Sequence, residues 1–239
     1  MSSQHAVTEM FDDISPRYDF LNHLLSFQID RIWRRKLSKL VAKSQPTAIL
    51  DVATGTADLA IRMAKDIPTA TITGVDLSEK MLELGRQKIA QKKLDQRITL
   101  MTDDAAHLPF ADNSFDAVTV AFGVRNFEDL EAGLKEMLRV VKNGGFVCIL
   151  EFSHPQKGFV KWPYRFYSKR LLPLIGRSLS KHQTAYDYLP ASIEAFPESN
   201  AFMQMLKHLG IADVKGKPLC GGVATLYYSP IQKKPAISQ

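Results

Sequence analysis

The amino-acid sequence predicts an α/β fold in which a mostly parallel sheet carries helices on both faces. Three observations lead to this prediction. Short apolar runs alternate with helical patterns over residues 46–153, a loop of small residues follows the first run, and two strand-like runs separated by a glycine pair close the chain. Strand–helix alternation implies right-handed crossovers, because parallel strands need a connection that crosses the sheet.

The composition is that of a globular protein with its own hydrophobic core. The chain has 239 residues, of which 45% are hydrophobic and 23% charged. Cys148 and Cys220 show neither a disulfide framework nor a metal-ligand spacing, so we expect a reducing compartment and no metal. We find no signal peptide and no apolar run near the roughly 18 residues of a membrane span, and therefore expect a cytoplasmic protein.

We expect one domain made of four segments. They are an N-terminal helical cap, a ligand-binding core, a helical lid insertion, and a last helix with a C-terminal hairpin, at residues 1–45, 46–153, 154–195 and 196–239. In the cap, Trp33, Leu37, Leu40 and Val41 follow helical spacing and predict one apolar face of an amphipathic helix. Basic residues occupy most of its other side.

The core alternates predicted strands with predicted helices. Branched apolar residues favour buried strands at Ala48–Val52, Thr71–Val75, Ile98–Met101, Ala117–Phe122 and Phe146–Phe152. Helical patterns lie between them at Asp58–Lys65, Glu79–Lys93 and Glu128–Val141. Asn143 and two glycines predict a turn before the last of these strands.

The C-terminal part follows a segment, 154–195, in which basic residues, aromatic residues and prolines interrupt the alternation. Ser199–Leu209 then predicts a helix that Gly210 ends. Asp213–Lys217 and Val223–Ser229 predict the two strands of a hairpin, because a glycine pair separates them.

The first candidate binding feature is the loop from Asp51 to Asp58, which leads from a strand into a helix. Small residues allow close approach of the backbone to a ligand, and the first amides of the helix are free donors. Only Gly55 remains of a three-glycine fingerprint, since Ala53 and Ala57 stand at the outer positions, so the loop alone also fits a plain turn.

Asp76 supplies the second binding feature. It ends the next predicted strand, 21 residues beyond Gly55, near the offset at which an acidic residue accepts both hydroxyls of a bound ribose. The alternative is a carboxylate that complements the dipole of the helix beginning near Ser78. The combination with the small-residue loop favours the ribose.

With Thr102–Phe110 after the third strand, the layout resembles class I methyltransferases that use S-adenosylmethionine. This resemblance implies a Rossmann-like, seven-stranded sheet, mostly parallel with an antiparallel last strand, and a turn after the third strand that holds the adenine. The cofactor residues that it implies are Asp51, Gly55, Thr56, Asp58, Asp76, Leu77, Asp104, Ala105 and Ala121.

Three stretches resemble the ubiquinone/menaquinone-biosynthesis C-methyltransferases more narrowly: Tyr18–Asn22 with Ser26 and Trp33, Phe122–Asn126, and Arg139–Ser153. The chain departs from that family at Asp30, Ala121 and Asn143, where His, Ser and Pro are usual. The resemblance implies C-methylation of a polyprenylated quinol, most simply demethylmenaquinol to menaquinol, with the benzoquinol of ubiquinone synthesis as a further acceptor.

The resemblance also implies the catalytic residues. A quinol that loses a hydroxyl proton becomes a phenolate whose ring carbon can attack a methyl group, so a base must lie within hydrogen-bond reach. Arg125 is implied as the catalytic centre, stabilising the phenolate and holding a water, with Asn126 and Tyr18 assisting. Asp19 and His23 are alternative proton acceptors, and Tyr18 equally fits a packed lid residue.

The net charge of +6 is concentrated in two segments. Arg31–Lys43 carries six basic residues and Lys157–His182 carries seven, both without an acid, so the remainder of the chain is acidic. We expect both segments to meet the inner face of the membrane that holds a polyprenyl substrate, through basic and aromatic side chains. The alternative is a solvated basic face with Trp33 packed in the core.

Two other functions compete with this hypothesis. Cations with aromatic residues also bind single-stranded nucleic acid, which would suit an RNA methyltransferase, and a nucleotide-binding module without catalysis would keep the loop and Asp76. Leu171–Ile175 favours lipid over RNA, and Arg125 with Asn126 argues against an inactive site. We therefore expect no nucleic-acid partner, and the sequence leaves a homo-oligomer open.

Overall fold

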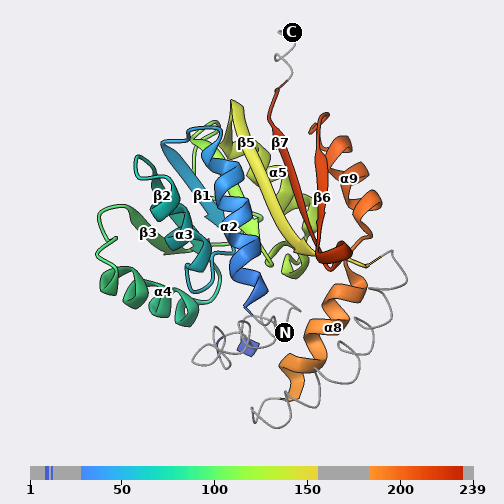
Figure 1. Ribbon diagram of the computed structural model, residues 1–239, viewed down its shortest axis with the longest axis horizontal. Helices are drawn as coiled ribbons and strands as arrows, with labels where there is room; N and C mark the ends of the chain where they lie inside the picture. The colour runs from blue at the N-terminus through green and yellow to red at the C-terminus, as the bar shows by residue number, and fades with distance from the viewer. Residues whose placement is uncertain (1–8, 11, 13–27, 156–182, 234–239) are drawn as a thin grey trace.

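The computed structural model describes residues 9–10, 12, 28–155 and 183–233. Within them, one seven-stranded sheet has the order β3-β2-β1-β4-β5-β7-β6, with helices on both faces (Figure 1). Tyr18, Asp19, His23 and the basic segment 157–182 lie outside the described residues. No helix among the described residues has the length and hydropathy needed to cross a membrane.

The strands match the predicted ones, with shifted ends. They are β1 (Ala48–Val52), β2 (Thr71–Asp76), β3 (Ile98–Thr102), β4 (Phe115–Ala121), β5 (Val141–Phe152), β6 (Lys215–Leu219) and β7 (Ala224–Pro230). The first five pair in parallel, and β7 pairs antiparallel with both β5 and β6. The predicted mostly parallel sheet with an antiparallel last strand is therefore confirmed.

The largest boundary difference lies in β5, which begins at Val141 instead of Phe146. Its pairing with β4 shifts register between Val141 and Phe146, so the extra residues form a bulge. Gly144 in this bulge has φ +78°, a conformation that side chains rarely adopt. The predicted turn at Asn143 is thus an interruption inside one long strand.

The helices are α2 (Ile29–Ala42), α3 (Asp58–Asp66), α4 (Glu79–Gln91), η1 (Val124–Asn126), α5 (Leu130–Val140), α8 (Gln183–Ala195), α9 (Ser199–His208) and η3 (Cys220–Gly222). Side chains of α2, α3 and α4 pack in the core on one face of the sheet, and those of α5 and α9 on the other (Figure 1). The sequence gives no bounds for α8, because Pro190 lies inside it and a proline normally indicates a helix break.

Helix α2 corrects one expectation about the membrane. Its apolar face, with Trp33 at 4% exposure and Leu37 and Val41 fully buried, packs into the core. Trp33 lies against the rings of Phe122 and Phe152, at centroid distances of 6.0 and 6.2 Å. This apolar face is therefore not available to a lipid surface, and Trp33 is packed in the core, as the alternative has it.

Candidate active site

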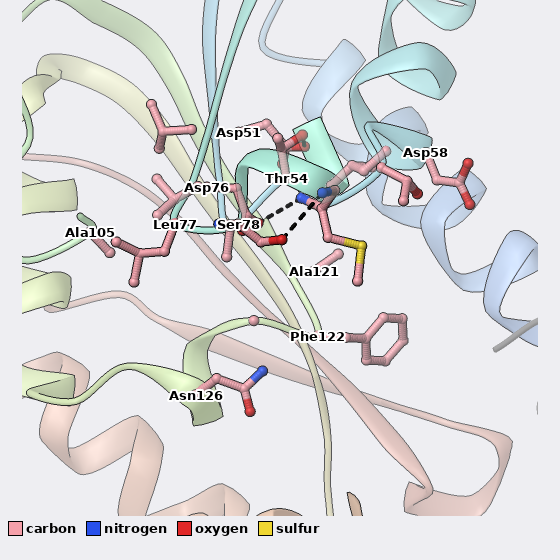
Figure 2. Close-up of a pocket in the computed structure, with 18 of the residues that line it drawn as sticks. Asp51, Thr54, Asp58, Asp76, Leu77, Ser78, Ala105, Ala121, Phe122 and Asn126 are labelled. Atoms are coloured by element: carbon pink, nitrogen blue, oxygen red, sulfur yellow. Dashed lines mark hydrogen bonds between the residues drawn. The ribbon is translucent and has the colours of Figure 1, made fainter. Parts of the chain in front are cut away.

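A cavity opens at the carboxyl edge of the sheet, beside the point where the strand order reverses between β1 and β4 (Figure 2). Ligands of open parallel sheets bind at this position, because the loops that leave neighbouring strands diverge there. The loops after β1, β2, β3 and β4 line the cavity, together with Arg34 of α2. All nine predicted cofactor residues are among the lining residues: Asp51, Gly55, Thr56, Asp58, Asp76, Leu77, Asp104, Ala105 and Ala121.

In the loop between β1 and α3, every second residue has a left-handed backbone conformation. Ala53, Gly55 and Ala57 have φ values of +50°, +55° and +63°, so all three positions of the fingerprint are left-handed although only one is glycine. A left-handed alanine costs about 1–2 kcal/mol. The fold therefore imposes this shape on the loop, which turns the Gly55 amide towards Asp76, at 2.7 Å.

Asp76 is held by the backbone at both carboxylate oxygens. Its Oδ2 accepts from the Gly55 amide at 2.7 Å and its Oδ1 from the Ser78 amide at 3.0 Å (Figure 2). Burial raises the pKa of this carboxyl group, against the effect of these hydrogen bonds. Ser78 caps α4 by accepting from the Met81 amide at 3.2 Å, so Asp76 is not the N-cap residue, although its bond to the Ser78 amide also complements the start of α4. Each Asp76 oxygen keeps further acceptor capacity for a pair of vicinal hydroxyls.

Asp51 lies deeper, at 1% exposure. Its two oxygens accept from the hydroxyls of Thr54 and Thr119, both at 2.7 Å. Burial raises its pKa to about 6, and the two hydrogen bonds and the positive charge of Arg34 oppose the increase. The floor of the cavity thus carries a carboxylate that is costly to ionise without a cation nearby.

The lining as a whole is acidic. Among the described residues that line the cavity there are five aspartates and one arginine, Arg34. Arg34 forms an ion pair with Asp30 of its own helix, and Asp58 forms one with Lys88 at 2.5 Å. A pyrophosphate would meet repulsion here, whereas a nucleoside that carries a positive charge would be attracted.

One wall suits a planar ring. Leu77, 38% exposed, and Met81 contribute apolar surface after β2, and Ala105 contributes a small side chain after β3. Asp104 accepts from the Ala106 amide at 3.0 Å, which fixes the turn beside this wall. A ring between Leu77 and Ala105 would have apolar contacts on its faces and polar groups at its edge.

Of the predicted catalytic pair, only one residue lies at the cavity. Asn126 lines the cavity, but Arg125 is not among the lining residues. The Arg125 side chain is 5% exposed and its Nη1 donates to Glu151 at 2.8 Å, with the Glu151 side chain fully buried. A buried carboxylate requires a paired cation, so Glu151 holds the guanidinium beneath η1.

Several residues of this region lie in stretches that the sequence analysis singled out but were not named individually as cofactor or catalytic residues. Thr54, Ser78 and Phe122 line the cavity, and Glu151 anchors Arg125. Glu151 had one visible signal, an acid at the end of the apolar run that forms β5. Among the described residues, no cluster of three or more His, Cys, Asp or Glu side chains could hold a metal ion.

Comparisons with known proteins agree with this geometry. A family model described as the ubiE/COQ5 methyltransferase family matches residues 1–230. A demethylmenaquinone methyltransferase of Bacteroides fragilis is 45% identical over 221 residues, covering 92% of this chain and 90% of the relative. The ubiquinone/menaquinone biosynthesis C-methyltransferase UbiE of Geotalea daltonii is 47% identical over 222 residues, covering 92% and 94%.

Solved structures share the fold at lower identity. A SAM-dependent methyltransferase from Aquifex aeolicus superimposes with a TM-score of 0.56 at 15% identity, over 80% of this chain and 87% of that one. Phosphoethanolamine N-methyltransferase 2 of Haemonchus contortus, in complex with S-adenosyl-L-methionine, gives 0.59 at 15% identity, over 78% and 49%.

Proposed function

The chain belongs to the ubiE/COQ5 methyltransferase family and is an S-adenosylmethionine-dependent methyltransferase, and from this premise we propose that its methyl acceptor is a polyprenylated quinol, most simply demethylmenaquinol. The observation that carries the proposal is the identity of 45–47% over 92% of the chain to relatives named for demethylmenaquinone and ubiquinone/menaquinone biosynthesis. The benzoquinol of ubiquinone synthesis is the second acceptor of the same class. RNA methylation and a non-catalytic module are not favoured by these relatives.

The residues present fit the cofactor. We assign the ribose hydroxyls to Asp76, because both its oxygens are oriented by backbone amides. We assign the adenine to the wall of Leu77, Asp104 and Ala105, and the amino-acid end to the loop at Gly55 and Thr56. The acidic lining suits the sulfonium charge.

At the amino-acid end, Arg34 is the one cation among the described lining residues, and we assign to it the carboxylate of the cofactor. Asp51 and Asp58, from the loop that faces it, balance the amino and sulfonium charges. The predicted cofactor residue Ala121 ends β4 and leads to the acceptor end of the cavity.

The bound cofactor supplies an electrophilic methyl group, so the protein must supply alignment and an electron-rich carbon. A quinol provides that carbon once a hydroxyl proton has left, whereas the oxidised quinone is electron-poor. Asn126 lines the acceptor end of the cavity and can donate to the phenolate oxygen. For the proton acceptor, Asp19 and His23 stay predictions, as does the assisting role of Tyr18.

We propose that Arg125 acts indirectly, by holding Asn126 in position. The family resemblance implies it as the catalytic centre, but its guanidinium donates to Glu151 and, at 2.5 Å, to the Phe122 carbonyl. It also lies over the Phe152 ring, at 5.4 Å from the centroid. These contacts support a residue that holds η1, and with it Asn126, at the edge of the cavity.

The test is turnover with reduced and oxidised demethylmenaquinone in parallel, using purified protein and labelled cofactor, with RNA as a further acceptor. We expect label in the reduced quinone only. Equal labelling of both redox forms would overturn the phenolate route. Labelling of RNA without labelling of any quinol would overturn the acceptor class.

We also propose that the protein is cytoplasmic and associates peripherally with the inner face of the membrane, where a polyprenyl substrate resides. The exposed side of α2 carries the cations Arg31, Arg35, Lys36 and Lys39, and Lys43 follows at the end of the helix. Ile32 lies among them at 54% exposure. Each cation near an anionic surface contributes about 1 kcal/mol, so attraction by α2 is mainly electrostatic.

Vesicle co-sedimentation tests this association. The wild-type protein should bind anionic vesicles and release them at high salt, and the double variant K36E/K39E should bind more weakly. Asp95→Lys, a charge change in the turn after α4, serves as the control. Equal binding to neutral and anionic vesicles would contradict an electrostatic attachment.

A further inference from the structure

Helix α8 reaches the acceptor end of the cavity through two side chains. The Tyr188 hydroxyl donates to Oδ1 of Asn126 at 3.0 Å. One turn later, the Ser192 hydroxyl oxygen accepts from Nε of Arg125 at 3.3 Å. Positions four residues apart lie on the same side of a helix, so α8 docks on η1 with one face.

The Tyr188 contact determines which end of the Asn126 amide faces the cavity. Figure 2 shows the amide nitrogen on the side of Phe122 and the oxygen directed away from it. The oxygen is the atom that Tyr188 binds, so the NH₂ group is the end presented to the cavity that Asn126 lines. A carboxamide has a donor end and an acceptor end, and only the donor end stabilises an anionic oxygen.

Tyr188 is suited to this task because it stays a donor. It is partly buried, and burial raises the pKa of its phenol, with Arg125 lowering it and Glu151 raising it. The neutral hydroxyl therefore persists throughout the neutral pH range. If the hydroxyl were absent, the amide could rotate and present its oxygen to the cavity, where it would repel a phenolate.

We propose that Tyr188 is a positioning residue for methyl transfer, which orients the Asn126 carboxamide so that its Nδ2 donates to the phenolate oxygen of the acceptor. This inference rests on the proposed function. It gives α8, which belongs to the segment predicted as a lid, an indirect part in methyl transfer, through Asn126.

The first test is Tyr188→Phe, which removes one oxygen atom. We expect kcat with reduced demethylmenaquinone to fall about 5- to 10-fold, the effect of one hydrogen bond. The Kd for S-adenosylmethionine, from calorimetry, should stay within about twofold, because Tyr188 is not among the residues that line the cavity.

The matched control is Tyr227→Phe. Tyr227 is a buried tyrosine whose hydroxyl, like that of Tyr188, donates to another side chain, here Ser199 at 2.9 Å, away from the cavity lining. Its loss should leave kcat unchanged. An equal loss of kcat in Tyr188→Phe and Tyr227→Phe would assign both effects to general stability and overturn the positioning role.

A double-mutant cycle with Asn126→Ala distinguishes a positioning role of Tyr188 from a purely structural one. If Tyr188 acts through Asn126, adding Tyr188→Phe to Asn126→Ala should cause no further loss of kcat. The same factor of loss in both backgrounds would overturn the proposal. The NH₂ resonances of Asn126 in asparagine-labelled protein should also shift in Tyr188→Phe and not in Tyr227→Phe.

The outcomes separate the two levels of inference. A wild-type protein that methylates no quinol would overturn the proposed methyl acceptor, and with it the positioning role of Tyr188. An active wild type with Tyr188→Phe unchanged in both kcat and the Asn126 resonances would overturn only the role of Tyr188.

Discussion

Replacing Asp51 with asparagine should stabilise the cofactor-free protein at neutral pH while weakening cofactor binding. Asp51 is fully buried beneath the cavity and accepts from the hydroxyls of Thr54 and Thr119. Burial raises its pKa from 3.8 to about 6, so ionisation in the folded state costs free energy. Asparagine has a similar shape and no charge to desolvate.

The sign of the pH dependence follows from proton linkage. Between about pH 4 and pH 6 the folded state holds a proton on Asp51 that the unfolded state has released, so the free energy of unfolding falls as pH rises. A shift of about 2 pKa units corresponds to about 3 kcal/mol, and this cost is fully present above pH 6. Replacing one carboxylate oxygen with an amide group offsets about 1 kcal/mol, because one threonine must change its hydrogen bond.

Urea denaturation of both proteins at pH 4 and pH 7.5 measures the effect. We expect Asp51→Asn to exceed the wild type by about 2 kcal/mol at pH 7.5 and to show no advantage at pH 4. In calorimetry, S-adenosylmethionine should bind the variant more weakly at pH 7.5, because the carboxylate that we propose to balance its positive charges is removed.

Asp116→Asn serves as a control, because its expected effect on the free energy of unfolding has the opposite sign. Burial raises its pKa, but hydrogen bonds from Lys142 and Thr47 outweigh burial and lower it overall. Its ionised form therefore stabilises the protein above the unfolded pKa, so Asp116→Asn should destabilise at pH 7.5 and have less effect at low pH. If Asp51→Asn were less stable than the wild type by the same amount at both pH values, ionisation of Asp51 would not destabilise the folded protein, contrary to our reasoning.

Three further predictions concern the cavity and the core. Asp76→Asn should raise the Kd for S-adenosylmethionine about 100-fold or more, measured by calorimetry, because the two charge-assisted contacts that we propose to the ribose would be lost. Gly123→Ala would bring a Cβ to 2.4 Å from that of Ala53 and should weaken cofactor binding, whereas Gly144→Ala, which has nothing within 4 Å, should leave binding unchanged in the same assay. Leu37→Ala should lower the free energy of unfolding in urea by about 2–5 kcal/mol, since its side chain is fully buried; a loss below about 1 kcal/mol would contradict the packing of α2 on the sheet.

The features that could be predicted from the sequence are those that depend on residues close together in the chain. One example is the continuous segment made of β1, the small-residue loop, α3 and β2. The cofactor residues predicted in this segment all line the cavity. Their positions follow from backbone geometry, since parallel strands end at one edge of the sheet. The nine predicted cofactor residues meet at the cavity for this reason.

The remaining features depend on contacts between distant residues. The Arg125 side chain is buried against Glu151 of β5, and no local sequence pattern predicts that pairing across 26 residues. Likewise Tyr188 binds Asn126 across 62 residues, from a helix with an internal proline. For α2, the helical period predicted the apolar face, but only the position of Phe122 and Phe152 shows that this face packs in the core.

The left-handed alanines at positions 53 and 57 affect how the cofactor loop responds to its ligand. A loop with three glycines would sample many shapes when empty and would lose that freedom on binding. Methyl groups at two of the three positions reduce the number of alternative shapes, and the surrounding fold already bears the torsional strain. The entropic penalty of binding should therefore be smaller for this loop than for its all-glycine counterpart, which would preorganise the loop for the contact that we propose with S-adenosylmethionine.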